Sequence, residues 1–152
     1  MEALERSRIR QKVFTFKTCA TWTGGRSATV AGEGKPALAV RGTPELKPEN
    51  DLWSSEDMFV AAVELCHMTT FLSAASKERL PVLSYKSHAN GVLEYVEGGY
   101  RFTRIVIFPT ITVPDPAMEA QVHALLREAQ KHCMVANSIA SLVEVNPTIM
   151  VE

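Results

Sequence analysis

Residues 54–79 have the sequence SSEDMFVAAVELCHMTTFLSAASKER, and this stretch decides the fold. It begins with an N-cap serine and two acidic residues, which favour the start of a helix. It ends in the charged run Lys77-Glu78-Arg79, just before Pro81, where a helix is interrupted. Its interior is apolar on nearly every side and rich in small residues. We therefore expect one long, central helix over residues 54–79 that packs closely against other elements.

The residues before this helix predict β-structure. Apolar and polar side chains alternate from Val13 to Trp22, which is the period of a strand, and a Gly24-Gly25 turn follows. A second pair of strands is expected over residues 27–31 and 37–41. Residues 42–51 are rich in proline and predict a loop.

The residues after the helix predict a hairpin, a second helix and a last strand. The two β-runs over residues 83–95 and 100–113 are joined by a Glu-Gly-Gly turn, a strong hairpin signal. Apolar residues at helical spacing then follow an Asp-Pro start, so a helix is expected over residues 116–132. Residues 143–151 return to β character and are interrupted by Pro147, which favours an edge strand.

Composition predicts a single domain over residues 1–152, with residues 1–11 loosely ordered. The chain has 46% hydrophobic and 22% charged residues, and its net charge is −1 with dispersed basic residues, so nucleic acid is not expected as a partner. The longest strongly apolar stretch, Met58–Val63, is far shorter than the roughly 18 residues of a membrane span. The charged N-terminus lacks the apolar region of a signal peptide. We expect a cytoplasmic protein without a membrane partner.

Cysteine is the residue type most able to carry chemistry in this chain. Three cysteines at wide spacing do not form the framework of a disulfide-rich secreted scaffold, so free or redox-cycling thiols are expected. Cys66 lies near the middle of the central helix and Cys133 at the end of the second helix, so both could face one cavity. Taken alone, a cysteine in an apolar helix is most often an inert core residue. Cys19, in the first strand, is interpreted as structural.

Four blocks of sequence indicate a family. They are WTGGR at residues 22–26, SEDMFVAA at residues 55–62, Cys66, and HCMVANS at residues 132–138. In order and spacing, over more than a hundred residues, these blocks resemble the OsmC/Ohr family of thiol peroxidases. The resemblance implies an α+β fold, with antiparallel β-sheets packed around the central helix, and an intertwined homodimer.

The resemblance also implies a reaction and its residues. Cys66 would attack an organic hydroperoxide, Cys133 would form a disulfide with it, and Arg26 and Glu56 would activate Cys66. A thiol has a pKa of about 8.5 and attacks as the thiolate, which a nearby guanidinium favours. The resemblance implies no cofactor, and it implies an external dithiol, of lipoyl type in relatives, as the reductant.

Four apolar residues were assigned to the wall of the substrate site, which would favour organic hydroperoxides over hydrogen peroxide. They are Phe59, Leu65, Met68 and Met134. Many relatives have small residues before the first cysteine, whereas here Glu64 precedes and His67 follows Cys66. Residues two apart on a helix point about 200° apart, so Glu64 should face away from the thiol.

Two other functions remain open from the sequence. The pairs Cys66-His67 and His132-Cys133 suggest zinc, but adjacent helical residues diverge by about 100° and no Cys-x-x-Cys spacing occurs, so no metal is expected. A non-enzymatic dimer that binds a small apolar ligand, or that senses redox state, would fit the same fold.

Helix geometry places one limit on the activating pair. Glu56 precedes Cys66 by ten residues, which is about 15 Å along a continuous helix at 1.5 Å per residue. No proline or glycine lies between them to break the helix. We therefore expect Glu56, together with Arg26, to act on the thiol of a second subunit.

Overall fold

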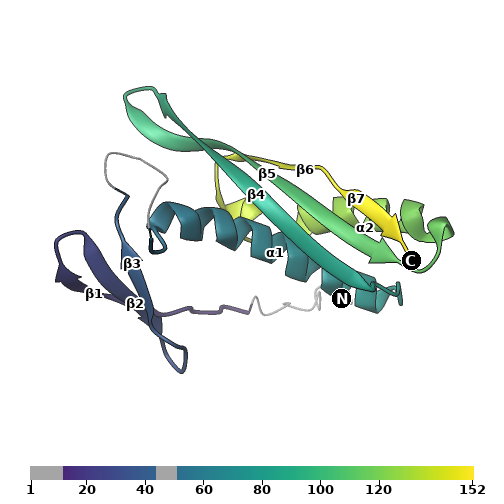
Figure 1. Cartoon of the computed structure of the whole chain (residues 1–152), viewed down its shortest axis with the longest axis horizontal. Helices are drawn as coiled ribbons and strands as arrows, with labels where there is room; N and C mark the ends of the chain where they lie inside the picture. The colour runs from purple at the N-terminus through teal and green to yellow at the C-terminus, as the bar shows by residue number, and fades with distance from the viewer. Residues whose placement is uncertain (1–11, 44–50) are drawn as a thin grey trace, which may run out of the picture. The chain divides into compact units, whose positions relative to one another are not determined.

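The structure, a computed structural model, describes residues 12–43 and 51–152 (Figure 1). The chain forms two compact units that divide between Ser54 and Ser55. The N-terminal segment 1–11 that was expected to be loosely ordered lies outside the described residues, as do residues 44–50 of the expected loop.

The first unit contains a three-stranded antiparallel sheet in the order β1-β2-β3. Its strands are β1 (Thr18–Gly24), β2 (Ser27–Gly32) and β3 (Leu38–Arg41). The strand predicted from residue 13 begins five residues later, because Thr18 pairs with Gly32 at the end of β2 and residues 13–17 pair with no strand of the described part of the chain. Gly24 and Gly25, at φ 123° and 55°, make the β1–β2 turn in a region that glycine adopts readily.

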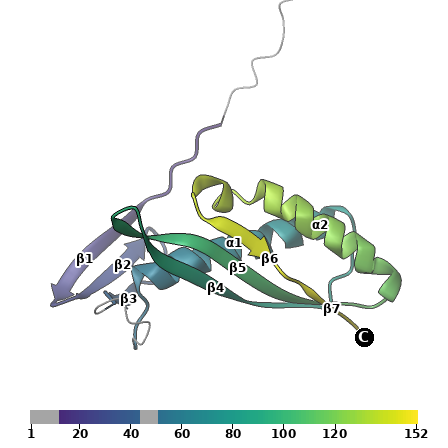
Figure 2. The ribbon, with the colours of Figure 1, turned by 90° about the horizontal axis from the view of Figure 1, so that it is seen from above.

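The second unit contains two helices and a four-stranded sheet. Its elements are α1 (Ser55–Lys77), β4 (Ser84–Val96), β5 (Gly99–Val113), α2 (Glu119–His132), β6 (Leu142–Val145) and β7 (Thr148–Val151). Figures 1 and 2 show that α1 and α2 cover the same face of this sheet. The predicted helices and the hairpin are therefore present with nearly the predicted bounds.

The sheet of the second unit is mixed, whereas the sequence predicted antiparallel strands. β4 and β5 form the antiparallel hairpin, but β6 and β7 both run parallel to β5. The reason is the connection: the chain leaves β5, crosses over through α2 and returns in the same direction, as parallel pairing requires. The hairpin turn itself has positive φ at Glu97 and Gly98, the combination of a type I′ turn.

One stripe of α1 faces the core. Val63, His67, Phe71 and Ala75 are buried at every fourth position. They pack with buried residues of β5 and α2: Ile105, Ile107, Ile111, Val113, Val122, Leu125, Leu126 and Ala129.

A glycine of β4 allows the sheet to approach the helix closely. A Cβ atom built on Gly91 would lie 2.4 Å from Val60 Cγ2 of α1. This contact and the buried stripe fix how α1 is rotated. Because successive residues differ by about 100°, Cys66 lies beside the stripe rather than on it.

Candidate active site

The structure brings together the two cysteines that the sequence paired. Cys66 lies in the fourth turn of α1 and is partly exposed, whereas Cys133 directly follows α2 and is 1% exposed. Their side chains are hydrogen-bonded to each other. Both thiols are free.

The end of α2 determines where Cys133 lies. Cys133 is the C-cap, with φ −68° and ψ 104°, so the backbone leaves the helix there. The chain then folds into a short 3₁₀ turn over residues 136–138, and the Asn137 N–H donates to the Cys133 carbonyl at 3.0 Å. The Asn137 side chain donates to the Lys131 carbonyl at 2.8 Å, and the Ser138 hydroxyl donates to the Met134 carbonyl at 2.7 Å. These bonds fix the shape of the chain over residues 131–138, and the 3₁₀ turn contacts α1.

Hydrogen bonds make Cys66 the more acidic thiol. Burial raises its pKa, but four hydrogen bonds stabilise the thiolate and together lower the pKa below its ordinary value. They come from the Val135 N–H, the Cys133 thiol, the Thr70 hydroxyl and the Met134 N–H. Since the thiolate is the nucleophilic form, this environment increases the reactivity of Cys66.

Cys133 is shifted in the opposite direction. Burial raises the pKa of its thiol, and the neighbouring Cys66 thiolate raises it further, although the Ala136 and Val135 N–H groups act against this. Cys66 therefore loses its proton first, while Cys133 stays a thiol and donates to it. The pair therefore consists of a more acidic thiol, Cys66, and a less acidic one, Cys133.

A groove opens beside Cys66 between α1 and α2, with a volume of about 420 Å³. Its walls carry hydroxyl groups, charged groups and one large apolar side chain. The lining residues are Thr69, Thr70, Ser73, Ala74, Lys77, Glu128, Ala129, His132 and Met134. A small molecule in this groove would lie next to Thr70, which is hydrogen-bonded to Cys66.

The structure does not bring Glu56 to the Cys66 of the same chain. α1 is continuous from Ser55 to Lys77, so the ten residues between Glu56 and Cys66 separate them by about 15 Å along the axis. Arg26 belongs to the first unit, where it lies in the turn between β1 and β2 with an exposed side chain.

The four predicted wall residues do not form one wall. Met134 lines the groove, and its N–H bonds to Cys66. Phe59 instead stacks on Phe102 in the core, with ring centroids 4.8 Å apart. Leu65 is 56% exposed on the outer side of α1, and Met68 is half-buried. The sequence could not separate these positions without knowing which side of α1 faces which neighbour.

Glu64 and His67, the two unusual sequence neighbours of Cys66, point away from the Cys66 thiol. Glu64 accepts a hydrogen bond of 2.6 Å from the Ser87 hydroxyl of β4, so it faces away from the thiol, as helix geometry predicted. His67 belongs to the buried stripe, and burial lowers its pKa more than the Leu126 carbonyl raises it. Neither side chain is among those that hold the Cys66 thiolate.

Thr70 and Val135 also contribute to the site, although no sequence motif indicated them. Thr70 follows Cys66 by four residues, a spacing that places two helical residues on one face, so it could have been found. Val135 contributes only its N–H, which no side-chain pattern reveals.

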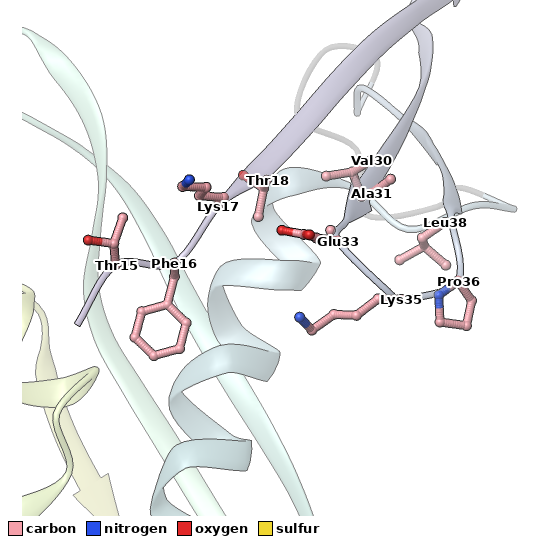
Figure 3. Close-up of a pocket in the computed structure, with 11 residues that line it drawn as sticks. Thr15, Phe16, Lys17, Thr18, Val30, Ala31, Glu33, Lys35, Pro36 and Leu38 are labelled. Carbon is pink, nitrogen blue, oxygen red and sulfur yellow. The ribbon is translucent and has the colours of Figure 1, made fainter.

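The first unit contains a separate hollow of about 750 Å³ (Figure 3). Its walls come from residues 15–18, before and at the start of β1, and from residues between 30 and 38, which run from the end of β2 to the start of β3. Its lining residues include neither Cys66 nor a residue hydrogen-bonded to Cys66, whereas Thr70 lines the groove in the second unit.

Comparison with known proteins gives consistent matches. A family model described as OsmC-like protein matches residues 48–148. An OsmC-like protein of unknown function from Vibrio cholerae is 25% identical, with a TM-score of 0.81 covering 90% of this chain and 100% of that one. An organic hydroperoxide resistance protein from Elizabethkingia anophelis is 21% identical, with a TM-score of 0.72 covering 93% and 99%. The uncharacterized protein YmaD of Bacillus subtilis is 20% identical over 133 residues, 85% of this chain and 89% of YmaD.

Proposed function

Because the chain belongs to the OsmC-like family, we propose that it is a thiol-dependent peroxidase that reduces organic hydroperoxides to alcohols. The observation that carries this proposal is the Cys66–Cys133 pair, in which a thiol of lowered pKa accepts a hydrogen bond from a buried second thiol. An organic hydroperoxide resistance protein shares the fold, which supports the choice of substrate class.

In the first step, the Cys66 thiolate attacks the terminal oxygen of the hydroperoxide. A sulfur–oxygen bond forms as the oxygen–oxygen bond breaks, and two electrons pass from sulfur to the substrate. The alkoxide takes up a proton and leaves as an alcohol, and Cys66 becomes a sulfenic acid. The lowered pKa of Cys66 supports this role, because only the thiolate attacks efficiently.

In the second step, Cys133 attacks the Cys66 sulfenic acid, and water leaves as the disulfide forms. The raised pKa of Cys133 keeps it protonated and unreactive until Cys66 has been oxidised. An external dithiol then reduces the disulfide by thiol–disulfide exchange. We propose a lipoyl-type dithiol, as the family resemblance implies.

Arg26 and Glu56 complete the proposed site from a second copy of the chain. A guanidinium beside the thiolate would lower the Cys66 pKa further, and a carboxylate would hold the fork of the arginine. The separation of about 15 Å along α1 between Glu56 and Cys66 is the reason for assigning Glu56 to the thiol of a partner subunit.

Exposed apolar residues of the first unit support a homodimer. Among residues 12–43 none is buried. Large side chains are exposed there: Val13 at 89%, Phe14 at 75%, Phe16 at 92% and Trp22 at 75%. A small sheet without a buried face is not stable by itself, so another surface must cover it. A second copy of this chain is the partner that would also supply the activating pair.

The outer side of α1 supports the same conclusion. In its most apolar stretch of 18 residues only 22% are buried, and Leu65 is 56% exposed. A helix of this length and composition also meets the requirement for a membrane span, but its buried stripe against β5 and α2 favours a core helix. We propose that the second subunit covers this side.

The proposal is tested by turnover of an alkyl hydroperoxide with a lipoyl-type dithiol as reductant. Catalytic production of the alcohol is expected. A redox sensor would be oxidised once without turnover, and a binding protein for apolar ligands would not consume the hydroperoxide, so either result would reject the peroxidase.

A further inference from the structure

Thr70 contacts Cys66 in two ways. It lies one helical turn after Cys66 on the same flank of α1, where side chains at i and i+4 meet. Its hydroxyl donates to the Cys66 carbonyl at 2.7 Å, and it is one of the groups that lower the pKa of the Cys66 thiol. One hydroxyl proton cannot serve both acceptors at once, so the hydroxyl must turn from the carbonyl toward the sulfur to donate to the thiolate.

The carbonyl does not depend on the Thr70 hydroxyl. As a helix residue, Cys66 has a carbonyl that accepts from the backbone N–H four residues later. The Thr69 hydroxyl also lies 3.2 Å from this carbonyl. The Thr70 hydroxyl is therefore able to turn toward the sulfur when the thiolate forms, without leaving an unsatisfied acceptor.

Thr70 also faces the place from which a substrate would approach. It lines the groove between α1 and α2, together with Ser73 and Met134. Its side chain is partly buried, which protects its hydrogen bonds from competing water. The hydroxyl thus lies between the groove and the thiol.

We propose that Thr70 is a further catalytic residue, whose hydroxyl donates to the Cys66 thiolate and accepts the O–H of the hydroperoxide. This rests on the proposed peroxidase function. A hydroxyl has one donor and two acceptor positions, so it makes both bonds at once. Together they hold the terminal oxygen of the substrate against the sulfur.

The reaction then proceeds without a proton leaving Thr70. The thiolate attacks the terminal oxygen, which keeps its hydrogen and becomes the hydroxyl of the Cys66 sulfenic acid. The oxygen–oxygen bond breaks, its electron pair goes to the alkoxide, and the alkoxide takes a proton from water to leave as an alcohol. Thr70 accepts from the same O–H before and after the transfer.

The test uses three variants. Thr70→Val keeps the branched shape but removes the hydroxyl, and Thr70→Ser keeps the hydroxyl. Thr103→Val is the control, because the Thr103 hydroxyl bonds to Val92 and Glu94 of β4 and does not line the groove. The readouts are kcat/KM for an alkyl hydroperoxide and the pH dependence of iodoacetamide alkylation at Cys66, followed by peptide mass spectrometry.

Thr70→Val should lower kcat/KM by about 10- to 100-fold, the typical effect of one hydrogen bond to a charged group, and should shift alkylation to higher pH. Thr70→Ser should restore both, and Thr103→Val should match the wild type. If Thr70→Val does not fold, Thr70→Ala serves in its place.

Equal kcat/KM and equal alkylation profiles in Thr70→Val and Thr103→Val would overturn the role of Thr70 while leaving the peroxidase intact. Absence of turnover in the wild type would reject the peroxidase and with it this role.

Discussion

The thiols of Cys66 and Cys133 share a hydrogen bond, yet their pKa values move in opposite directions. Burial raises both, but hydrogen bonds from residues 133–135 and Thr70 outweigh it only at Cys66. As the pH rises, Cys66 therefore ionises at a lower pH than its neighbour Cys133.

This difference predicts selective alkylation of the reduced protein. At neutral pH, iodoacetamide should modify Cys66 well before Cys133, because the thiolate reacts and the buried thiol does not. As the pH is raised, the alkylation rate of Cys66 should reach its plateau at a lower pH than the alkylation rate of an unperturbed cysteine. Peptide mass spectrometry during alkylation measures both rates, and equal rates at the two residues would contradict the assignment.

The shared site predicts recovery of activity in mixed dimers. Cys66→Ser lacks the attacking thiol and Arg26→Ala lacks the guanidinium, so each homodimer should be inactive. After subunit exchange, a heterodimer would pair the intact Cys66 of one chain with the intact Arg26 of the other, giving about one working site. Activity that does not rise above the sum of the two unmixed proteins would exclude a site built from two subunits.

His67 predicts a loss of stability in acid. Burial lowers its pKa below the usual 6.5, so the folded chain binds a proton there at lower pH than the unfolded chain. Unfolding therefore takes up a proton, and the free energy of unfolding should fall as the pH drops below about 6.5. Denaturant titrations at several pH values in this range give the free energy of unfolding at each pH. Its decrease with falling pH should be smaller for His67→Leu than for the wild type or for His88→Gln, in which the substituted histidine is exposed. Equal slopes in all three would refute the prediction.

Gly91 predicts a packing defect between β4 and α1. The Cβ of Gly91→Ala would lie 2.4 Å from Val60 Cγ2 and 2.9 Å from Phe102 Cε1, which should destabilise the fold by about 1–3 kcal/mol. Gly99→Ala is the control, since no atom lies within 4 Å of its Cβ. Adding Val60→Ala should recover part of the loss, measured by a double-mutant cycle. If Gly91→Ala and Gly99→Ala are equally stable, the close approach is not required.

The local parts of the fold could be predicted from the sequence. The helix expected over residues 54–79 spans Ser55–Lys77, and the hairpin and second helix lie close to their predicted bounds. These elements depend on caps, turns and periodicity within a few residues of each other. The parallel pairing of β6 and β7 could not be predicted in this way, because it depends on which strand the chain meets after α2.

In the candidate site, too, local features could be predicted from the sequence, whereas features that depend on tertiary structure could not. The resemblance paired Cys66 with Cys133, whose side chains interact in the structure, and helix geometry predicted that Glu64 faces away from the thiol. The apolar wall was wrong in part, because Leu65 is adjacent to Cys66 in sequence but about 100° away on the helix. The backbone N–H groups that hold the thiolate depend on the turn after α2 and not on side-chain identity.

The most direct test of the peroxidase proposal is a mass-spectrometric map of the reduced protein after one equivalent of an alkyl hydroperoxide. The account predicts an intrachain Cys66–Cys133 disulfide and one equivalent of the alcohol. Cys133→Ser should instead retain a trappable sulfenic acid on Cys66. Cys66 left fully reduced, with oxidation confined to Cys19, would contradict the account.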